Sequence, residues 1–181
     1  RGAELSDKVI GIFGFGHIGK EVARLANGFN MKVLGYHYRP VKANDEFEFV
    51  DRQTLLTSSD ILTVHVALNS RTRHMIGTRE FEAMKPDALL INTSRGAVID
   101  EFALIDALKK GKIGGAGLDV FEEEPLPADS PLRKLNNVIL TPHMAGEPDG
   151  LYFHAKRFKF FYENIQRVAR GKAPKYVLNK L

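Results

Sequence analysis

The chain has 181 residues, a length that suits one domain, or one domain and a fragment of a second. Its 26 Lys and Arg residues outnumber its 22 Asp and Glu residues only slightly and are scattered, so we expect no nucleic-acid partner. It has no cysteine, which excludes disulfides and cysteine nucleophiles, and no membrane-length apolar run or leader, so we expect a cytoplasmic protein without a membrane partner.

Apolar runs alternate with amphipathic stretches along most of the chain. The apolar runs predict strands over 9–13, 31–36, 61–66, 88–92 and 138–140, and one within 113–120. The amphipathic stretches predict helices over 17–29, 51–57, 78–84 and 100–110, with Thr78 and Asp100 as caps of the last two and a polar loop over 40–50. Because mostly continuous apolar strands alternate with helices, the sequence predicts an α/β fold, a doubly wound parallel sheet with helices on both faces.

The pattern changes after Gly146. Apolar residues recur at helical spacing, Pro148 suits an early helical position and Gly171 suits the end, so we expect one long C-terminal helix. This stretch carries more aromatic residues than one buried stripe needs. They are either core contacts or an interface with a partner subunit or another domain.

A glycine-rich motif links the first predicted strand to the first predicted helix. Gly14 permits a tight turn, Gly16 lets the backbone approach a ligand, and Gly19 lets the helix pack close to the strand. The helix N-terminus at His17 and Ile18 then offers N–H groups to an anion. This order predicts a Rossmann-like dinucleotide site, with a βα turn that binds no ligand as the alternative.

Three polar residues follow predicted strands at the edge where such folds bind ligands: Arg95, Glu124 and His143. Taken singly, they could be a structural ion pair, a solvated acidic run and a loop histidine. Together they suit hydride transfer to a 2-oxo acid. A guanidinium can hold the substrate carboxylate, a histidine can supply the proton, and a carboxylate can fix the tautomer and stabilise the imidazolium.

With these motifs in this order, the chain resembles the coenzyme-binding domain of the D-isomer-specific 2-hydroxyacid dehydrogenase family. The resemblance runs from about Glu4 to Lys172 and rests on Gly14–Gly19, His65–Arg73, Met84–Pro86, Asn92–Val98 with Asp100, Gly115–Pro125 and Leu140–Gly146. It implies an NAD(P)-dependent oxidoreductase that acts on a small 2-oxo or 2-hydroxy acid. It also implies a homodimer formed through the coenzyme domain.

The resemblance further implies roles for individual residues. Arg95 would bind substrate, Glu124 would orient the histidine, and His143 would be the acid/base. Asp119 would contact the nicotinamide carboxamide. The residues expected along the cofactor are Gly14, Gly16, His17, Ile18, Gly19, His37, Arg39, His65, Thr72, Thr93, Ser94, Asp119 and Gly146. No metal site is expected, because the histidines lack ligand spacing.

One departure from the family pattern concerns the cofactor. His37 stands where the family commonly has an acidic residue for the ribose hydroxyls of NAD, and Arg39 follows it. Without the carboxylate a 2′-phosphate is not repelled, and Arg39 could bind one. We therefore expect a preference for NADP, or use of both cofactors. The alternative is that both are ordinary loop residues and NAD is used.

The second departure is length, because the glycine-rich strand begins close to Arg1. We expect a dinucleotide-binding domain over 1–172 and a tail over 173–181 that is a remnant of a substrate domain. Such a piece should bind cofactor but turn over poorly. The alternative function is a dinucleotide-sensing module of the corepressor type. A P-loop hydrolase is excluded, because the sequence contains no GxxxxGK[ST].

Overall fold

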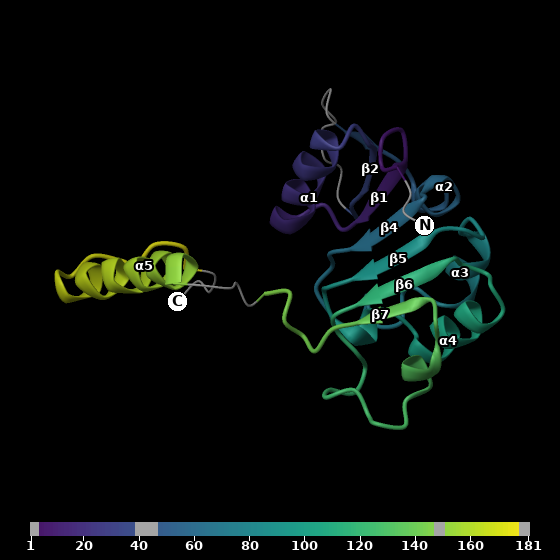
Figure 1. The fold of residues 1–181 in the computed structure, drawn as a ribbon. Helices are drawn as coiled ribbons and strands as arrows, with labels where there is room; N and C mark the ends of the chain where they lie inside the picture. The colour runs from purple at the N-terminus through teal and green to yellow at the C-terminus, as the bar shows by residue number, and fades with distance from the viewer. Residues whose placement is uncertain (1–3, 39–46, 147–150, 178–181) are drawn as a thin grey trace. The chain divides into compact units, whose positions relative to one another are not determined.

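The computed structural model describes residues 4–38, 47–146 and 151–177 (Figure 1). It divides the chain into two units, Arg1–His143 and Met144–Leu181, which are described separately. This division lies earlier in the chain than the boundary expected at residue 172.

The first unit is built on a seven-stranded parallel sheet with the order β3-β2-β1-β4-β5-β6-β7 (Figure 1). Its strands are β1 Val9–Phe13, β2 Lys32–Tyr36, β3 Glu48–Phe49, β4 Ile61–Val64, β5 Leu89–Asn92, β6 Gly115–Leu118 and β7 Val138–Leu140. The chain winds outward from β1 to β3 and then returns to place β4 on the other side of β1. This reversal is the switch point of a doubly wound sheet, and the predicted fold class is confirmed.

The short strand β3 corrects the prediction of a polar loop over 40–50. Glu48 and Phe49 pair with Leu34 and Gly35 of β2, and the Phe49 ring contacts the Phe15 ring at a centroid distance of 4.9 Å. Two residues are too few to show an alternating pattern. The rest of the predicted loop, up to residue 46, lies outside the described residues.

The helices of the first unit are α1 His17–Gly28, α2 Arg52–Ser58, α3 Thr78–Ala83 and α4 Glu101–Lys109, with 3-10 turns η1 Gly96–Val98 and η2 Pro131–Lys134. The predicted cap of α4 is confirmed, because the Asp100 carboxylate accepts from the Ala103 N–H at 3.0 Å. The predicted Thr78 cap of α3 is wrong. Thr78 is already helical, and the Glu80 carboxylate reaches back to the Gly77 N–H at 2.8 Å.

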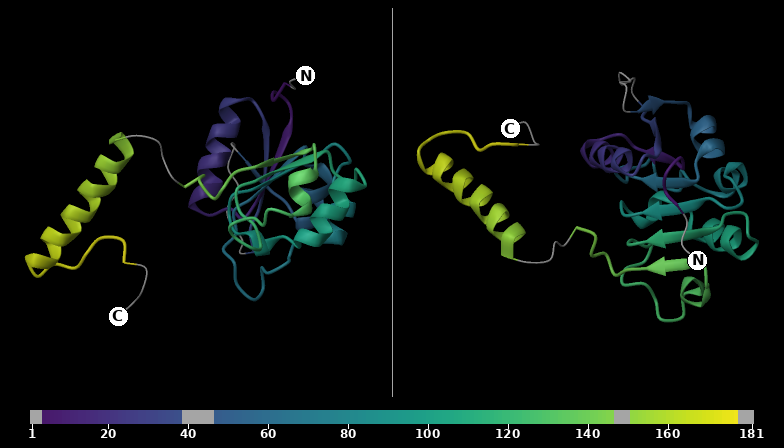
Figure 2. Two further views of the ribbon diagram at one scale, coloured as in Figure 1. Left: turned by 60° about the horizontal axis from the view of Figure 1, so that its bottom comes forward. Right: turned by 45° about the horizontal axis from the view of Figure 1, so that its top comes forward.

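Helices of the first unit lie on both faces of the sheet (Figure 2). Helix α1 packs on one face through Ala23 and Ala26, against Ile10 and Ile12 of β1. Helices α2, α3 and α4 cover the other face, over a larger cluster that includes Phe13, Leu55, Leu62, Phe81, Leu90 and Leu104. This alternation follows from the strand period of two, since successive β1 side chains point to opposite faces. Among the described residues, no helix is long and apolar enough to cross a membrane.

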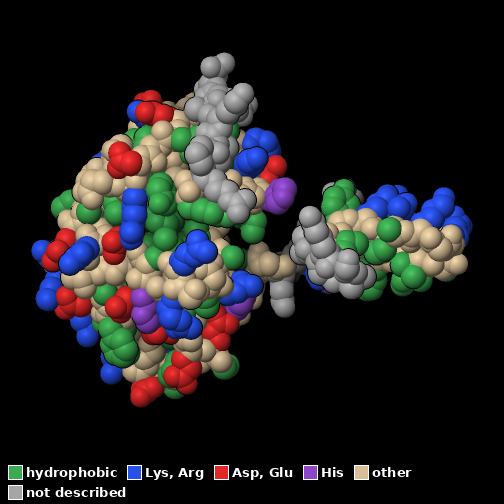
Figure 3. Space-filling view, turned by 180° about the vertical axis from the view of Figure 1, so that it is seen from behind, with side chains coloured by type: hydrophobic (Ala, Val, Ile, Leu, Met, Phe, Trp, Pro, Cys, Tyr) green, Lys and Arg blue, Asp and Glu red, His purple; other side chains and the backbone are tan. Residues whose placement is uncertain are grey.

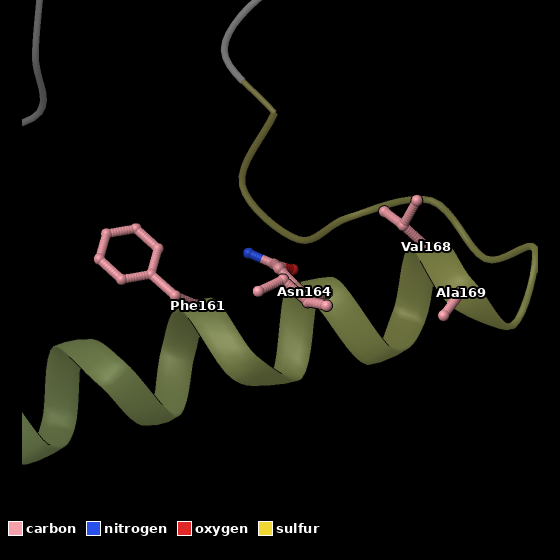
Figure 4. A pocket seen from close by; sticks show the side chains of 5 residues that line it. Phe161, Asn164, Val168 and Ala169 are labelled. Atoms are coloured by element: carbon pink, nitrogen blue, oxygen red, sulfur yellow. The ribbon is translucent and has the colours of Figure 1, made fainter.

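The second unit contains the long helix expected after residue 146, α5 Leu151–Ala169, and Gly171 follows it with φ +69°. Pro148 lies outside the described residues. The tail folds back along the helix, because Asn164 Oδ1 accepts from the Lys175 N–H at 2.8 Å and Arg167 Nε donates to the Ala173 carbonyl at 2.9 Å. A shallow apolar hollow lies on this helix, lined by Phe161, Asn164, Ile165, Val168 and Ala169 (Figure 4).

Candidate functional site

The predicted site residues of the first unit follow the carboxyl ends of the sheet strands. The glycine-rich turn follows β1, His65 follows β4, Thr93 to Arg95 follow β5, Asp119 follows β6 and His143 closely follows β7. Because all strands are parallel, these ends lie along one edge of the sheet. The fold therefore gathers residues that are far apart in the sequence.

The three glycines of the motif are needed for different structural reasons. Gly14 has φ +103°, and a Cβ on it would lie 2.6 Å from the His65 carbonyl oxygen. A Cβ on Gly19 would lie 2.5 Å from the Gly14 carbonyl oxygen. The protein's own packing thus requires glycine at both positions.

Gly16 is different, because a Cβ there would meet nothing within 4 Å. It is the N-cap residue of α1, makes no side-chain cap and leaves the first helical N–H groups, at His17 and Ile18, to other acceptors. Open space before an uncapped helix N-terminus is what a dinucleotide pyrophosphate requires. The residues present therefore fit such a group.

The position expected to meet the cofactor ribose lies just after β2. The His37 ring contacts the Tyr38 ring at a centroid distance of 4.7 Å. Arg39 lies outside the described residues, so its expected contact with a 2′-phosphate stays a prediction.

Two further predicted cofactor residues lie after β4. The His65 N–H donates to the Phe13 carbonyl at 2.8 Å, and its Nε2 lies 3.0 Å from Thr63 Oγ1. Burial lowers the pKa of His65, so the ring is neutral at physiological pH. The Thr72 hydroxyl donates to the Ala67 carbonyl at 2.7 Å and accepts from the Asn69 N–H at 2.8 Å, so it shapes its own loop.

Asn92 is a site residue that the sequence reasoning did not single out. Its side chain is buried, its Oδ1 accepts from the Ser94 N–H at 3.0 Å and from Ser94 Oγ at 2.8 Å, and its Nδ2 donates to the Arg95 carbonyl at 3.1 Å. Asn92 thus fixes the loop that presents the exposed Thr93 and Arg95. The sequence signal that could have identified Asn92 is its place as the polar residue at the end of an otherwise apolar strand, Leu89–Asn92.

The loop after β5 is pressed against the loop after β6. A Cβ on Gly96 would lie 1.9 Å from the carbonyl carbon and oxygen of Phe121, so only glycine permits this approach. The contact brings the Arg95 loop next to the loop that carries Glu124. The positive charge of Arg95 accordingly acts on Glu124.

Glu124 and His143 form the centre of the site. Glu124 Oε2 lies 2.7 Å from His143 Nδ1, and Glu124 Oε1 accepts from the Phe121 N–H at 3.0 Å. The hydrogen bond with His143 lowers the pKa of Glu124 below its usual range, although burial opposes this effect. The hydrogen bond from the Phe121 N–H and the positive charges of His143 and Arg95 lower the pKa further. A charged carboxylate therefore faces Nδ1 and leaves Nε2 to act on a ligand.

Asp119 is held by a second residue that the sequence reasoning missed. Asp119 is buried, and the Thr141 hydroxyl donates to its Oδ1 at 2.6 Å. Thr141 thus connects the end of β6 to the segment that leads into His143. Gly146 belongs to the second unit, so its expected cofactor contact stays a prediction.

A hollow of about 650 Å³ adjoins the Glu124–His143 pair. It is lined by Phe121, Glu124, Pro125, Leu126, Arg133, Leu140, Thr141, Pro142 and His143. Among the described residues, no group of three or more His, Asp or Glu side chains could hold a metal ion. On the face of the first unit shown in Figure 3, acidic and basic side chains are interspersed.

Comparisons with known proteins identify the family of this chain. A family model for the NAD-binding domain of D-isomer specific 2-hydroxyacid dehydrogenases matches residues 1–145. The glyoxylate reductase of Thermococcus litoralis is 47% identical to this chain, and the match covers 99% of this chain and 54% of that protein. The chain spans about half the length of this relative.

Solved structures show the same likeness. The D-lactate dehydrogenase of Lactobacillus jensenii with NAD+ gives a TM-score of 0.87 at 34% identity, covering 99% of this chain and 58% of that one. An NADPH-dependent glyoxylate/hydroxypyruvate reductase of Sinorhizobium meliloti, in complex with NADP and sulfate, gives 0.85 at 28% identity, covering 99% and 58%.

Proposed function

We propose that this chain, which belongs to the D-isomer specific 2-hydroxyacid dehydrogenase family, is the part of a 2-oxo acid reductase that binds the nicotinamide cofactor and supplies the acid/base pair. The observation that carries the proposal is the 2.7 Å contact between Glu124 and His143 at the sheet edge that also holds the glycine-rich turn. A carboxylate–imidazole pair at this edge suits proton transfer beside a bound dinucleotide.

The residues of the site divide the chemistry among them. When bound, the dinucleotide supplies the hydride. Arg95 binds the substrate carboxylate and draws electron density from the neighbouring carbonyl group. Glu124 stabilises the protonated, positively charged His143 ring through Nδ1, and this imidazolium donates its Nε2 proton to the carbonyl oxygen and becomes neutral. In the direction of oxidation, the same pair accepts the hydroxyl proton.

The test of this function is the reduction of glyoxylate, the substrate named for the Thermococcus relative, by NADPH or NADH. We expect slow turnover from this chain, since a site in the family lies in a cleft that a second domain completes. Cofactor binding, followed by nicotinamide fluorescence, is measured in parallel. Binding without any turnover, even when the remaining half of a relative is supplied, would contradict the proposal.

The cofactor preference is a finer proposal, with NADP favoured over NAD or used beside it. Its support is His37, which places no carboxylate where NAD-binding relatives commonly have one, and the nearby Arg39. We expect NADPH to bind about tenfold more tightly than NADH, and the two dissociation constants measure this. The variant His37→Asp should reverse the order. Tighter binding of NADH by the unmodified chain would contradict the preference.

The assembly and location of the protein stay predictions. A homodimer is supported by the exposed aromatic residues of α5, such as Phe158 and Phe161, and sedimentation measures it. The cytoplasmic location, the absence of a nucleic-acid partner and the 1–172 domain extent are likewise predictions.

The corepressor alternative finds no support in the comparisons, in which the named proteins are reductases and dehydrogenases.

A further inference from the structure

We propose that His74, Glu101 and Glu122 are positioning residues that hold the Glu124 loop in place against the neighbouring segments of the site. The inference rests on the proposed function, because it concerns the same acid/base pair. None of the three residues touches His143 in the described contacts. They act on the backbone from which Glu124 extends.

The first link is a reciprocal clasp between α4 and the loop after β6. Glu122 Oε1 accepts from the Glu101 N–H, and Glu101 Oε2 accepts from the Glu122 N–H, both at 3.2 Å. Glu101 is the first residue of α4, so its N–H has no partner within the helix. The Glu122 carboxylate therefore satisfies the helix N-terminus from another segment, where the helix dipole favours a negative charge.

The second link joins this clasp to the loop after β4. His74 Nε2 lies 2.7 Å from the same Glu122 Oε1. The His74 N–H also donates to the Ala97 carbonyl of η1 at 2.8 Å. His74 thus connects the loop of Thr72 to the turn after Arg95 and, through its ring, to the loop of Glu124.

The clasp matters for the acid/base pair because Glu122 and Glu124 share one short loop. The orientation of Glu124 depends on the Phe121 N–H, which binds its Oε1, and the Phe121 carbonyl group packs against Gly96. A shift of the backbone at Glu122 would move this N–H. Small displacements of a group that positions an acid/base can cost large factors in rate.

The clasp also brings the Glu101 carboxylate close to other carboxylates, whose negative charges repel it. Burial first, and then the charges of Glu122 and Glu123, raise the pKa of Glu101, while the bond from the Glu122 N–H lowers it. Two neighbouring carboxylates contribute little to the stability of a fold, because their like charges repel each other. Their geometry is instead suited to fix the separation between two loops.

The test compares two substitutions at Glu122. Glu122→Ala removes the acceptor for both His74 and Glu101, whereas Glu122→Gln keeps a side-chain oxygen at the same reach. The control is Glu123→Ala, which removes a charge from the same loop and leaves the described clasp bonds in place. The side chains of His74 and Glu122 are 41% and 28% exposed, so we expect all three variants to fold.

The first readout is the pair of ring 15N chemical shifts of His143, measured by NMR on the purified chain. We expect Glu122→Ala to change these shifts and both Glu122→Gln and Glu123→Ala to retain the wild-type values. The second readout is turnover, where Glu122→Ala should lower kcat about tenfold with little change in KM. Absence of turnover in the unmodified chain, even when the remaining half of a relative is supplied, would contradict only the proposed function, because the NMR comparison does not depend on activity.

Unchanged His143 shifts in folded Glu122→Ala would overturn the inference, as would changed His143 shifts in folded Glu122→Gln. If Glu122→Ala does not fold, His74→Asn provides the decision. His74 has φ +50°, which asparagine tolerates better than alanine, and the substitution removes the ring contact with Glu122. A wild-type His143 spectrum in His74→Asn would then reject the role of the clasp.

Discussion

At the scale of single residues, the proposed chemistry depends on a charge rather than on a hydrogen bond alone. In Glu124→Gln, an amide oxygen can still accept from His143 Nδ1, but the charge that stabilises the imidazolium is lost. We expect kcat to fall about 100-fold with an unchanged dissociation constant for the cofactor. Steady-state kinetics and a fluorescence titration measure the two quantities. Wild-type turnover in this variant would show that Glu124 does not support the histidine.

The residues to which we assign the chemistry follow a simpler sequence signal than the residues that hold them. Arg95, Glu124 and His143 each follow a predicted strand, and the parallel fold alone places such residues at one edge. Thr141 and Glu122 act through contacts with distant segments, whereas Asn92 acts within its own loop. Those contacts depend on the tertiary arrangement, which spacing along the chain does not encode.

At the scale of elements, Asp60 joins the beginnings of three strands. Its carboxylate accepts from the Val9 N–H at 2.7 Å and from Lys85 Nζ at 2.8 Å, and its carbonyl accepts from the Leu89 N–H at 2.9 Å. Burial raises the pKa of Asp60, but the Lys85 and Val9 hydrogen bonds, together with the charges of Lys85 and Lys8, bring it below its usual value. The folded state therefore favours the charged form.

This depressed pKa predicts how Asp60→Asn depends on pH. A depressed acid stabilises the fold above its unfolded pKa of about 3.9, and this contribution is lost as pH falls through the folded pKa. We expect Asp60→Asn to cost about 2 kcal/mol at neutral pH and almost nothing near pH 2. Urea unfolding at both pH values measures the difference. The exposed Asp87→Asn is the matched control, and an equal cost at both pH values would contradict the prediction.

The ends of the strands show which structural property the apolar pattern of the sequence follows. The strand predicted within 113–120 is β6, Gly115–Leu118, and Ile113 and Val120 outside it are both buried as well. Burial extends beyond backbone pairing, and the pattern follows burial. Strand β3 was missed for the opposite reason, since it is paired over only two residues.

At the scale of the whole molecule, the alternation of strands and helices was sufficient to predict the doubly wound sheet. The structure divides the chain into two compact units after His143, and the expected domain extent of 1–172 stays a prediction. The change of pattern after Gly146, with its extra aromatic residues, is compatible with core contacts as well as with an interface, so it does not by itself locate a separate unit. That division becomes visible only in the core, whose buried hydrophobic residues in the described part of the chain all lie between Ile10 and Leu132.

A core confined to these residues predicts that the first unit folds by itself. A chain that ends at Gly146 keeps all seven strands, both hydrophobic clusters and the Glu124–His143 pair. We expect it to unfold cooperatively, with Tm within about 4 °C of the complete chain and with cofactor binding retained. Calorimetry and fluorescence titration check this. A control chain that ends at Leu118 lacks β7 and the buried Leu132 and should not fold. Non-cooperative unfolding of the longer truncation would mean that residues beyond Gly146 supply stability that the core of the first unit does not contain.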